Sequence, residues 1–243
     1  MTNSNEIGKM LDALSLKQSQ IAENLASGNT QMRTLAKRVW RVQEDERKHI
    51  ARELHDGVGQ LLTALINQLE MTTQDDISTE LQTSLQDSLE LARQALSDTR
   101  KISRLMRPRI LDDLGLEPAL KWLTRVMKEE EKTDIVLQTQ LDHELDGETQ
   151  TLVFRIVQES INNAVKHAKA STIKVQVVAH PSLLMVKVSD DGVGMDTEKA
   201  LGPEGFGLSA MQDRVSAFGG QLMIQSKLGE GSEIKMVLMG NYS

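Results

Sequence analysis

The chain has 243 residues, no cysteine, four prolines and a formal net charge of −7 at pH 7. Without cysteine it can hold neither a disulfide nor a thiolate metal site, and its acidic balance argues against direct binding of nucleic acid or an anionic lipid surface. No stretch reaches the roughly 18 uninterrupted apolar residues of a membrane helix, and the first residues lack a signal-peptide core, so we expect a cytoplasmic protein.

Helix-breaking residues are distributed unevenly along the chain. All four prolines and twelve of the sixteen glycines lie after residue 107. Because both residue types disfavour helix interiors, we predict a multi-domain fold: an all-α helical hairpin that forms a dimeric four-helix bundle, followed by an α+β sandwich. We assign residues 1–44 to a signalling or coiled-coil helix, 45–107 to the hairpin and 109–243 to the sandwich.

The first segment carries a heptad pattern. Apolar residues recur at alternating spacings of four and three between Ile7 and Val42. Such heptads are typical of a helix that pairs with another helix, most simply its own copy, although one amphipathic helix on a globular core is the alternative. Gly28 is where we would place a break.

Two further periodic stretches follow, at residues 50–69 and 81–106. The segment between them, residues 72–76, has the composition of a turn, and Ser78 is a candidate N-cap. The second helix should end before Pro108. Since one hairpin cannot bury both apolar faces by itself, we expect two copies to pair as a homodimer.

The pattern changes after residue 108. We expect helices at residues 116–130, 148–169 and 207–218, and strands at 134–141, 172–179, 183–189, 221–226 and 233–239. Strands on one side and helices on the other make the α+β sandwich.

His55 lies in the most informative segment of the first half, ERKHIARELHDGVGQ. On a helix its imidazole stands about 100° from the core residue Leu54, on the shoulder of the apolar stripe, where solvent can reach it. Asp56 and Gln60 lie beside it. Gly57 and Gly59 each cost about 1 kcal/mol relative to alanine in a helix, which indicates space cleared for another surface. A helix end or kink at the glycines, with a merely solvated histidine, is the alternative.

The chemistry of these side chains suits nucleophilic catalysis. A neutral imidazole has a free lone pair at pH 7, and a carboxylate can fix its tautomer and support the cation formed on attack. Asp56 is placed to do this for His55. Gln60 can orient a water molecule, as glutamine does in GTP hydrolysis.

A second group of polar residues lies on the predicted helix at 148–169. Glu159, Asn163 and Lys166, with His167, share one face of that helix. These groups suit hydrated Mg²⁺ and phosphates, because the amide oxygen can meet the metal and the ammonium group the phosphate charge. A polar helix face is usually only solvated, so this signal is weak by itself.

Two pairs of glycines follow that helix. Asp190 ends a strand and precedes Gly192 and Gly194, while Gly205 and Gly207 stand immediately before a helix. Glycines let the backbone approach a ligand closely, and a helix N-terminus favours anionic phosphate. Neither pair forms a Walker P-loop or a Rossmann fingerprint, and either alone would be a routine turn.

Taken in order, these segments resemble a bacterial two-component sensor histidine kinase of the subfamily that includes the nitrate/nitrite sensors and the membrane-fluidity thermosensor. Residues 46–60 match its dimerisation-helix motif E-R-x-x-I-A-R-E-L-H-D-x-x-x-Q, and residues 107–120 resemble its junction between bundle and ATP domain. Three segments are similar to the nucleotide boxes of the superfamily shared with gyrase B, Hsp90 and MutL: residues 159–167, 190–194 and 205–215.

The resemblance implies a role for each matched residue. His55 would be the phosphoacceptor and Asp56 its activating base, and Asp56 with Gln60 would serve dephosphorylation of the response regulator. Asn163 would be a Mg²⁺ ligand, with Glu159 as a supporting group and second candidate ligand.

The implied ATP site includes Asp190, which would hydrogen-bond the adenine amino group, and a short lid at residues 195–204. The other residues implied in ATP binding, besides Glu159 and Asn163, are Lys166, His167, Gly192, Gly194, Gly205, Gly207, Leu208 and Ser232.

The activity that the resemblance implies is that of an ATP-dependent protein histidine kinase. It would autophosphorylate His55, pass the phosphoryl group to an aspartate of a response regulator, and also dephosphorylate that regulator. ATP and Mg²⁺ would be its cofactors, and a second copy and a regulator with a helix-turn-helix output its partners. The input would come from a separate sensor protein or an upstream sensor region.

Three alternatives remain open. An anti-sigma-type serine kinase would share the glycine boxes but has no need of H-D-G-V-G-Q on a dimerising helix. A degenerate kinase acting as a phosphatase or scaffold is disfavoured by the intact Asn163 and Asp190. A coiled-coil interaction protein with an inert α/β domain predicts no nucleotide binding.

Overall fold

The computed structural model describes residues 30–72, 78–131, 133–197 and 206–240. The heptads before residue 30, with the proposed break at Gly28, and most of the predicted lid lie outside these ranges. Within them, no helix is both long and apolar enough to cross a bilayer.

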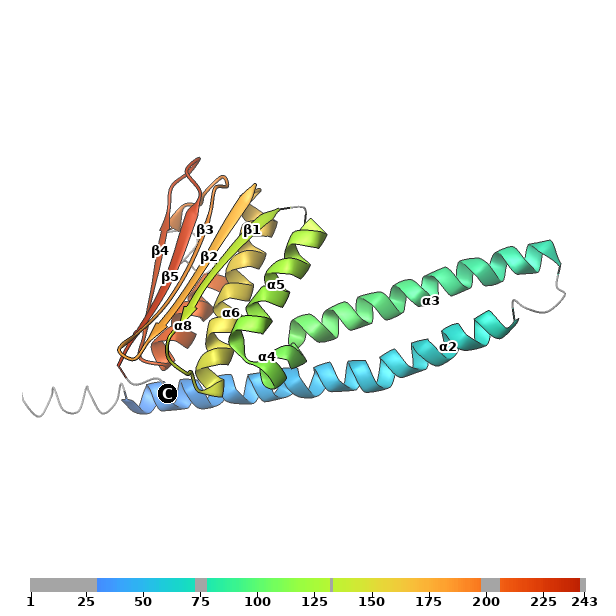
Figure 1. Cartoon of the computed structure of the whole chain (residues 1–243), viewed down its shortest axis with the longest axis horizontal. Helices are drawn as coiled ribbons and strands as arrows, with labels where there is room; N and C mark the ends of the chain where they lie inside the picture. Colours follow the sequence, from blue (N-terminus) through green and yellow to red (C-terminus); the bar gives the residue numbers. More distant parts are fainter. Residues whose placement is uncertain (1–29, 73–77, 132, 198–205, 241–243) are drawn as a thin grey trace, which may run out of the picture.

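The helical part begins with one uninterrupted helical stretch. Residues 30–53, which we term the stalk helix, continue through a π-helical turn, η1 (Leu54–Val58), into α2 (Gly59–Thr72). The chain then folds back as α3 (Thr79–Met106), antiparallel to α2 in the hairpin (Figure 1). The predicted cap is confirmed, because the Ser78 side chain accepts a hydrogen bond from the backbone N–H of Leu81.

The hairpin is held by one narrow apolar seam. Its buried members are Ile66, Leu89, Ala92 and Leu96, with Leu62 and Leu69 packed against them. Leu61, which lies on the predicted stripe, is 73% exposed. The apolar residues of α2 therefore form two faces, of which one contacts α3 and the other is exposed in the single chain.

The second part of the chain is a layered α/β domain. Its elements are α4 (Arg109–Leu114), α5 (Leu116–Glu131), β1 (Asp134–Leu141), α6 (Gly147–Asn163), η2 (Ala164–Ala168), β2 (Thr172–His180), β3 (Leu183–Asp190), α8 (Phe206–Ala217), β4 (Gln221–Ser226) and β5 (Ser232–Met239). Every predicted strand and helix of this part is confirmed to within about two residues. The short α4 was not predicted, because six residues between Pro108 and Gly115 are too few to show a helical period.

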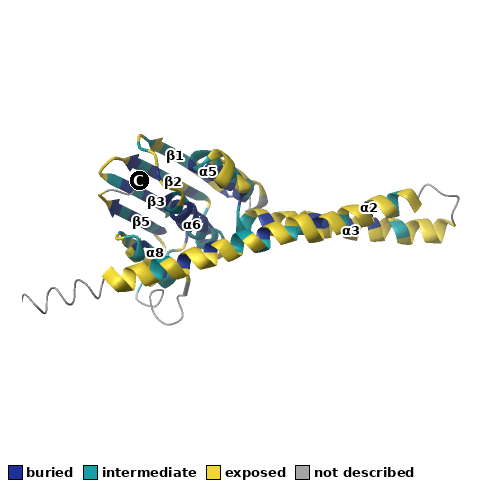
Figure 2. Cartoon of the chain, turned by 90° about the horizontal axis from the view of Figure 1, so that it is seen from below, coloured by how far each residue is buried: buried dark blue, intermediate teal, exposed yellow. Residues whose placement is uncertain are grey.

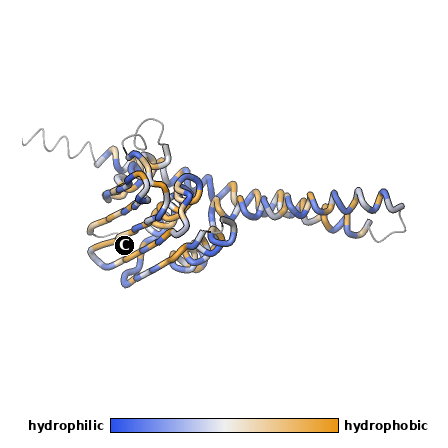
Figure 3. The backbone as a smooth tube through the Cα atoms, turned by 90° about the horizontal axis from the view of Figure 1, so that it is seen from above, coloured by the Kyte–Doolittle hydropathy of each residue, from blue (hydrophilic) through white to orange (hydrophobic). Residues whose placement is uncertain are grey.

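The five strands form one mixed sheet in the order β1-β2-β3-β5-β4. β1 pairs with β2 in parallel, and the other neighbours are antiparallel. Hydropathy alternates along the strands (Figure 3), and fully buried residues alternate with partly exposed ones. Helices α5, α6 and α8 cover one face of the sheet (Figure 1).

The stalk helix packs against this α/β domain. Trp40 is only 5% exposed and belongs to the same hydrophobic core as α6 and the sheet. Its ring meets Phe218, directly after α8, edge-on at 5.0 Å between centroids, and the Lys37 ammonium group lies 4.5 Å from the Phe218 centroid. Figure 2 shows the stalk helix passing beside α8. The sequence did not predict this contact.

Candidate functional site

His55 is exposed and stands in the π-helical turn η1. The two glycines neither end nor sharply interrupt the helix. The helix is wider over the single π-helical turn η1 and then continues as α2. A Cβ added at Gly57 would meet nothing within 4 Å, so the η1 turn that carries His55 is also open to solvent at Gly57. Single π-helical turns inside α-helices occur frequently at functional sites.

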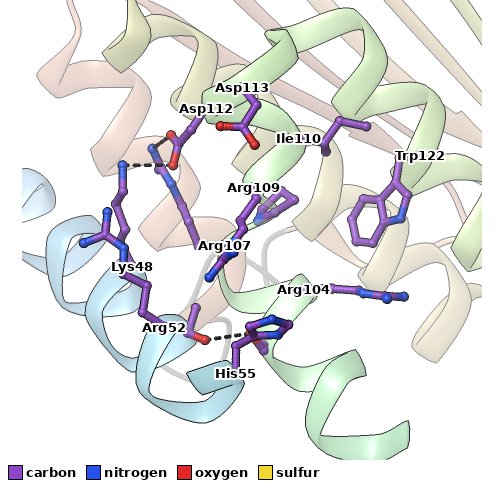
Figure 4. Close-up of a pocket in the computed structure, with 13 residues that line it drawn as sticks. Lys48, Arg52, His55, Arg104, Arg107, Arg109, Ile110, Asp112, Asp113 and Trp122 are labelled. Atoms are coloured by element: carbon purple, nitrogen blue, oxygen red, sulfur yellow. Dashed lines mark hydrogen bonds and ion pairs between the residues drawn. The ribbon is translucent and has the colours of Figure 1, made fainter. Parts of the chain in front are cut away.

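Two hollows border His55. The first, which we term the junction pocket, has a volume of about 500 Å³ and lies between the stalk helix, the end of α3, residues 107–113 and Trp122 of α5 (Figure 4). The second, the hairpin groove, measures about 350 Å³ and runs between α2 and α3, where Gln60 lines it. His55 can therefore be approached from both sides.

Asp56, the predicted base, is paired with a different residue. Its carboxylate lies 3.6 Å from the guanidinium of Arg109, and both side chains are well exposed. No hydrogen bond joins Asp56 to His55 within the described residues, since consecutive side chains on a helix point roughly 100° apart. The catalytic role of Asp56 stays a prediction.

Glu159 and Asn163 lie together on α6, facing the start of α8. A Cβ placed on Gly207 would stand 3.0 Å from Glu159 Oε1 and 4.0 Å from Asn163 Nδ2. Both polar residues are half-buried. Gly207 therefore leaves room for these two side chains at the first turn of α8, and the structure brings together three of the predicted nucleotide residues.

Lys166 and His167 follow on a second π-helical turn, η2, and are both exposed. This turn breaks the regular helical phase assumed for the shared face. Lys166 and His167 therefore lie exposed just after the end of α6, while Glu159 and Asn163 are half-buried and face the start of α8.

Asp190 ends β3 next to two hydrogen-bond donors. The Gly192 backbone N–H donates to its Oδ1 at 2.9 Å, and Ser232, which pairs with Asp190 across the sheet, also hydrogen-bonds it. Burial raises the pKa of Asp190, and these hydrogen bonds only partly offset the effect. A half-buried carboxylate whose pKa is raised by burial is a functional-site candidate.

The loop after Asp190 is packed too tightly for side chains. A Cβ at Gly192 would lie 2.3 Å from the Ala168 carbonyl oxygen, and one at Gly194 (φ 68°) would lie 2.0 Å from that of Lys227. The glycines therefore hold the loop against η2 and the β4–β5 turn. Leu208 is buried under the first turn of α8, and Gly205 lies outside the described residues.

Asp191 is a structural residue that the sequence analysis did not single out. Its carboxylate accepts hydrogen bonds from the Ser171 hydroxyl at 2.6 Å and from the backbone N–H groups of Ser171 and Thr172. The Ser171 hydroxyl is the main cause that lowers the pKa of Asp191 to about 2. The adjacent aspartates thus differ in environment: Asp191 ties the start of β2 to the loop, and Asp190 is half-buried and hydrogen-bonded to Gly192 and Ser232.

Comparisons with known proteins agree with this geometry. Residues 46–111 match a family model described as histidine kinase, and residues 148–240 match one described as histidine kinase-, DNA gyrase B- and HSP90-like ATPase. The chain belongs to the histidine kinase family. The matched ranges contain η1 with His55 and all the described nucleotide candidates.

The chain is similar in sequence to several curated proteins. It is 33% identical over 227 residues to the signal transduction histidine-protein kinase/phosphatase UhpB of Salmonella typhimurium, covering 91% of this chain and 45% of that protein. It is 34% identical over 201 residues to the histidine-protein kinase/phosphatase DegS of Brevibacillus brevis, covering 79% and 50%. The chain spans about half the length of the curated relatives it matches.

One solved structure with a similar chain path is the histidine kinase domain of the blue-light activated histidine kinase from Erythrobacter litoralis EL346. The TM-score is 0.45 at 19% identity, and the match covers 74% of this chain and 94% of that one.

The residues of the ATP domain are compatible with ATP and Mg²⁺. Mg²⁺ is usually held by one or two protein oxygens together with substrate phosphates and water. Glu159 and Asn163 supply such oxygens, and no cluster of three or more His, Cys, Asp or Glu side chains suited to a metal occurs within the described ranges. This donor set fits a metal that arrives with a nucleotide rather than a closed protein cage.

The two candidate sites of the chain are separate in the structure. The hollows beside His55 are lined by the stalk helix, the hairpin, residues 107–113 and Trp122, and by none of the predicted nucleotide residues. The structure therefore places Glu159 and Asn163 beside Gly207, and Asp190 beside Gly192 and Ser232, but brings none of them to the hollows beside His55. Arg104 and Arg109, which line the junction pocket, were not predicted, because their only signal was the basic composition of residues 104–109.

Proposed function

We propose that this chain is an ATP-dependent protein histidine kinase of a two-component system that phosphorylates its own His55. The observation that carries the proposal is the exposed imidazole on a π-helical turn, within the histidine kinase match and in the same chain as an ATPase-type domain. We place the functional boundaries at residues 45–107 for the phosphoacceptor hairpin and 109–243 for the ATP domain.

The reaction at His55 is a direct phosphoryl transfer. A ring nitrogen of the neutral imidazole attacks the γ-phosphorus of ATP, an N–P bond forms, and the bond from that phosphorus to the ADP oxygen breaks. The ring then carries a positive charge until its N–H proton is released. Asp56 accepts this proton, which requires its carboxylate to leave the exposed pair with Arg109.

The ATP domain binds the nucleotide through Asp190 and the α6 face. The Asp190 carboxylate accepts a hydrogen bond from the adenine amino group, next to Ser232. Asn163, with Glu159 as a second candidate ligand, would hold Mg²⁺, which would offset the phosphate charge. Lys166 after the end of α6 would add positive charge with His167 beside it, and the glycine loops let the backbone approach the phosphates.

Transfer requires a different placement of the ATP domain from the one described. Because none of the described nucleotide residues lines the hollows beside His55, either the ATP domain moves or a partner protomer supplies the reacting site. The outward apolar face of the helices, with Leu35, Val39 and Leu61 exposed, suits pairing with a second copy in a homodimer.

The phosphoryl group then passes to an aspartate of a response regulator. The hairpin groove is the docking surface nearest His55, and Gln60, which lines it, orients the water that dephosphorylates the same regulator. Two relatives are named histidine-protein kinase/phosphatase, which supports this pair of activities. A regulator with a helix-turn-helix output would make any DNA contact.

Two substitutions test the proposal independently. With γ-³²P-labelled ATP, His55→Gln should abolish acid-labile label while nucleotide binding, measured by calorimetry, is retained. Asp190→Asn should lose nucleotide binding by about tenfold or more, while the helical content is unchanged. Acid-labile label that persists in His55→Gln would refute the assignment of the phosphoacceptor.

A further inference from the structure

The junction pocket beside His55 has a strong excess of positive charge. Two carboxylates line it, Asp112 and Asp113. Five cations also line it: Lys48, Arg52, Arg104, Arg107 and Arg109. The pocket thus carries three more positive than negative side chains on a chain whose net charge is −7, which is the arrangement expected where an anion is received.

Some of these cations already have close partners. Arg107 and Lys48 both bind the Asp112 carboxylate, at 2.7 Å and 2.9 Å. Burial would raise the pKa of Asp112, but hydrogen bonds from Arg107 and Lys48 outweigh it and lower the pKa. Arg107 also faces the buried Glu44 carboxylate, at 3.5 Å. Lys48, Arg107 and Asp112 thus form part of the pocket wall.

The remaining three cations are free to bind something else. Among the described residues, Arg109, the first residue of α4, has one ion pair, the 3.6 Å pair with Asp56, which is longer than a hydrogen bond and exposed to solvent. Arg52 and Arg104 make no ion pair within the described residues. Arg52 lies one helical turn before His55, and Arg104 lies on α3 on the opposite side of the pocket (Figure 4).

We propose that the junction pocket receives the phosphoryl group of phosphorylated His55, with Arg109 as its main ligand and Arg52 and Arg104 as supporting cations. The inference rests on the proposed phosphorylation of His55. A phosphoryl group brings about −1.5 to −2 charges and three acceptor oxygens, and a guanidinium binds such a group through two parallel N–H donors. Arg109 exchanges a weak pair for a stronger one, and Asp56 is released.

The pocket makes and breaks no covalent bond in this step. The N–P bond forms at the expense of the P–O bond to ADP during transfer from ATP, and the arginines hold the oxygens of the product. They therefore stabilise phosphorylated His55 relative to free His55. The equilibrium between histidine plus ATP and phosphohistidine plus ADP must shift toward phosphohistidine by the same factor.

The first test measures that equilibrium. At a fixed ratio of ATP to ADP, approached from both directions, Arg109→Gln should lower the ratio of phosphorylated to free His55 by about tenfold or more, the loss expected for one charge-assisted contact. Arg104→Gln should lower it less, and Arg109→Lys should restore part of it. The matched control is Arg125→Gln on α5, which removes one exposed arginine outside the pocket. An unchanged ratio in Arg109→Gln would overturn the proposal.

A second measurement does not need kinase activity. Phosphoramidate, a small phosphoryl donor, modifies histidine chemically, and mass spectrometry identifies molecules modified at His55. Modified wild-type protein should melt at a higher temperature than unmodified protein, and this difference should disappear in Arg109→Gln but remain in Arg125→Gln. Absence of ATP-dependent label with a retained melting shift would refute the kinase proposal alone, and label without a melting shift would refute the pocket alone.

Discussion

Glu44 and Arg155, 111 residues apart in the sequence, form a buried ion pair that joins the stalk helix to α6. Arg155 is 3% exposed and Glu44 7% exposed, and the guanidinium binds the carboxylate through Nε at 3.0 Å and Nη2 at 2.7 Å. Nη2 also donates to the Met106 carbonyl oxygen at the end of α3, at 2.5 Å. One side chain thus connects the stalk helix, the hairpin and the ATP domain.

Removing the Glu44 charge should leave the Arg155 guanidinium buried without its counter-ion. Burial already lowers the pKa of Arg155, and Glu44 is the main group opposing that effect. We expect Glu44→Gln to cost about 3 kcal/mol of unfolding free energy, measured by urea denaturation. The control is Arg41→Gln on the stalk helix, which breaks a more exposed pair with Glu148 of α6. It should cost less than about 1 kcal/mol. Equal small losses would contradict the role of burial.

Gly57→Ala should separate stability from activity at the phosphoacceptor. The added Cβ meets no atom within 4 Å in the described structure, and alanine favours helix by about 1 kcal/mol over glycine. We therefore expect a higher melting temperature. Autophosphorylation should nevertheless slow, because the added methyl group occupies open space on the η1 turn that the ATP domain must approach to reach His55. Unchanged autophosphorylation kinetics would show that this space is not used.

Gln60→Ala should keep the kinase and weaken the phosphatase. Gln60 lines the hairpin groove rather than the junction pocket, so its loss leaves the arginines around His55 unaltered. We expect autophosphorylation within about twofold of wild type and dephosphorylation of the cognate regulator reduced at least about tenfold, as for loss of a water-orienting group. A parallel loss of both activities would contradict this division.

Asp191 should make stability depend on pH in the acid range. Hydrogen bonds from Ser171 lower the pKa of its carboxyl to about 2, below the ordinary value of 3.8, so the folded state binds this proton less tightly than the unfolded state. The stabilisation is complete above the ordinary pKa and is lost as pH falls through about 2.

The corresponding measurement compares wild type with Asp191→Asn by thermal denaturation. The difference in stability should be largest near neutral pH and shrink as the pH falls from about 5 to about 3. Ser171→Ala, which removes the hydroxyl donor at 2.6 Å, should make this stability difference depend less on pH. A difference that stays constant over this range would contradict the assigned cause.

Most secondary structure of the ATP domain could be predicted because its signals are local. The strand predicted at residues 134–141 is β1 with the same bounds, since alternation of apolar and polar residues directly records which side chains face the core. The predicted grouping of Asp190 with Ser232 depended on the family resemblance; their contact arises from pairing of β3 with β5.

The sequence by itself determined the periodic helices and the strands, because spacing and residue type are properties of neighbours along the chain; the candidate active residues come from their motifs and stay predictions. The tertiary structure alone decided that Trp40 enters the core of the ATP domain, that Glu44 meets Arg155, and that Arg104 and Arg109 line the same pocket as His55. These contacts join residues that are far apart in the sequence, so no periodic pattern along the chain indicates them. Which residues meet depends on how the stalk helix and the ATP domain pack together.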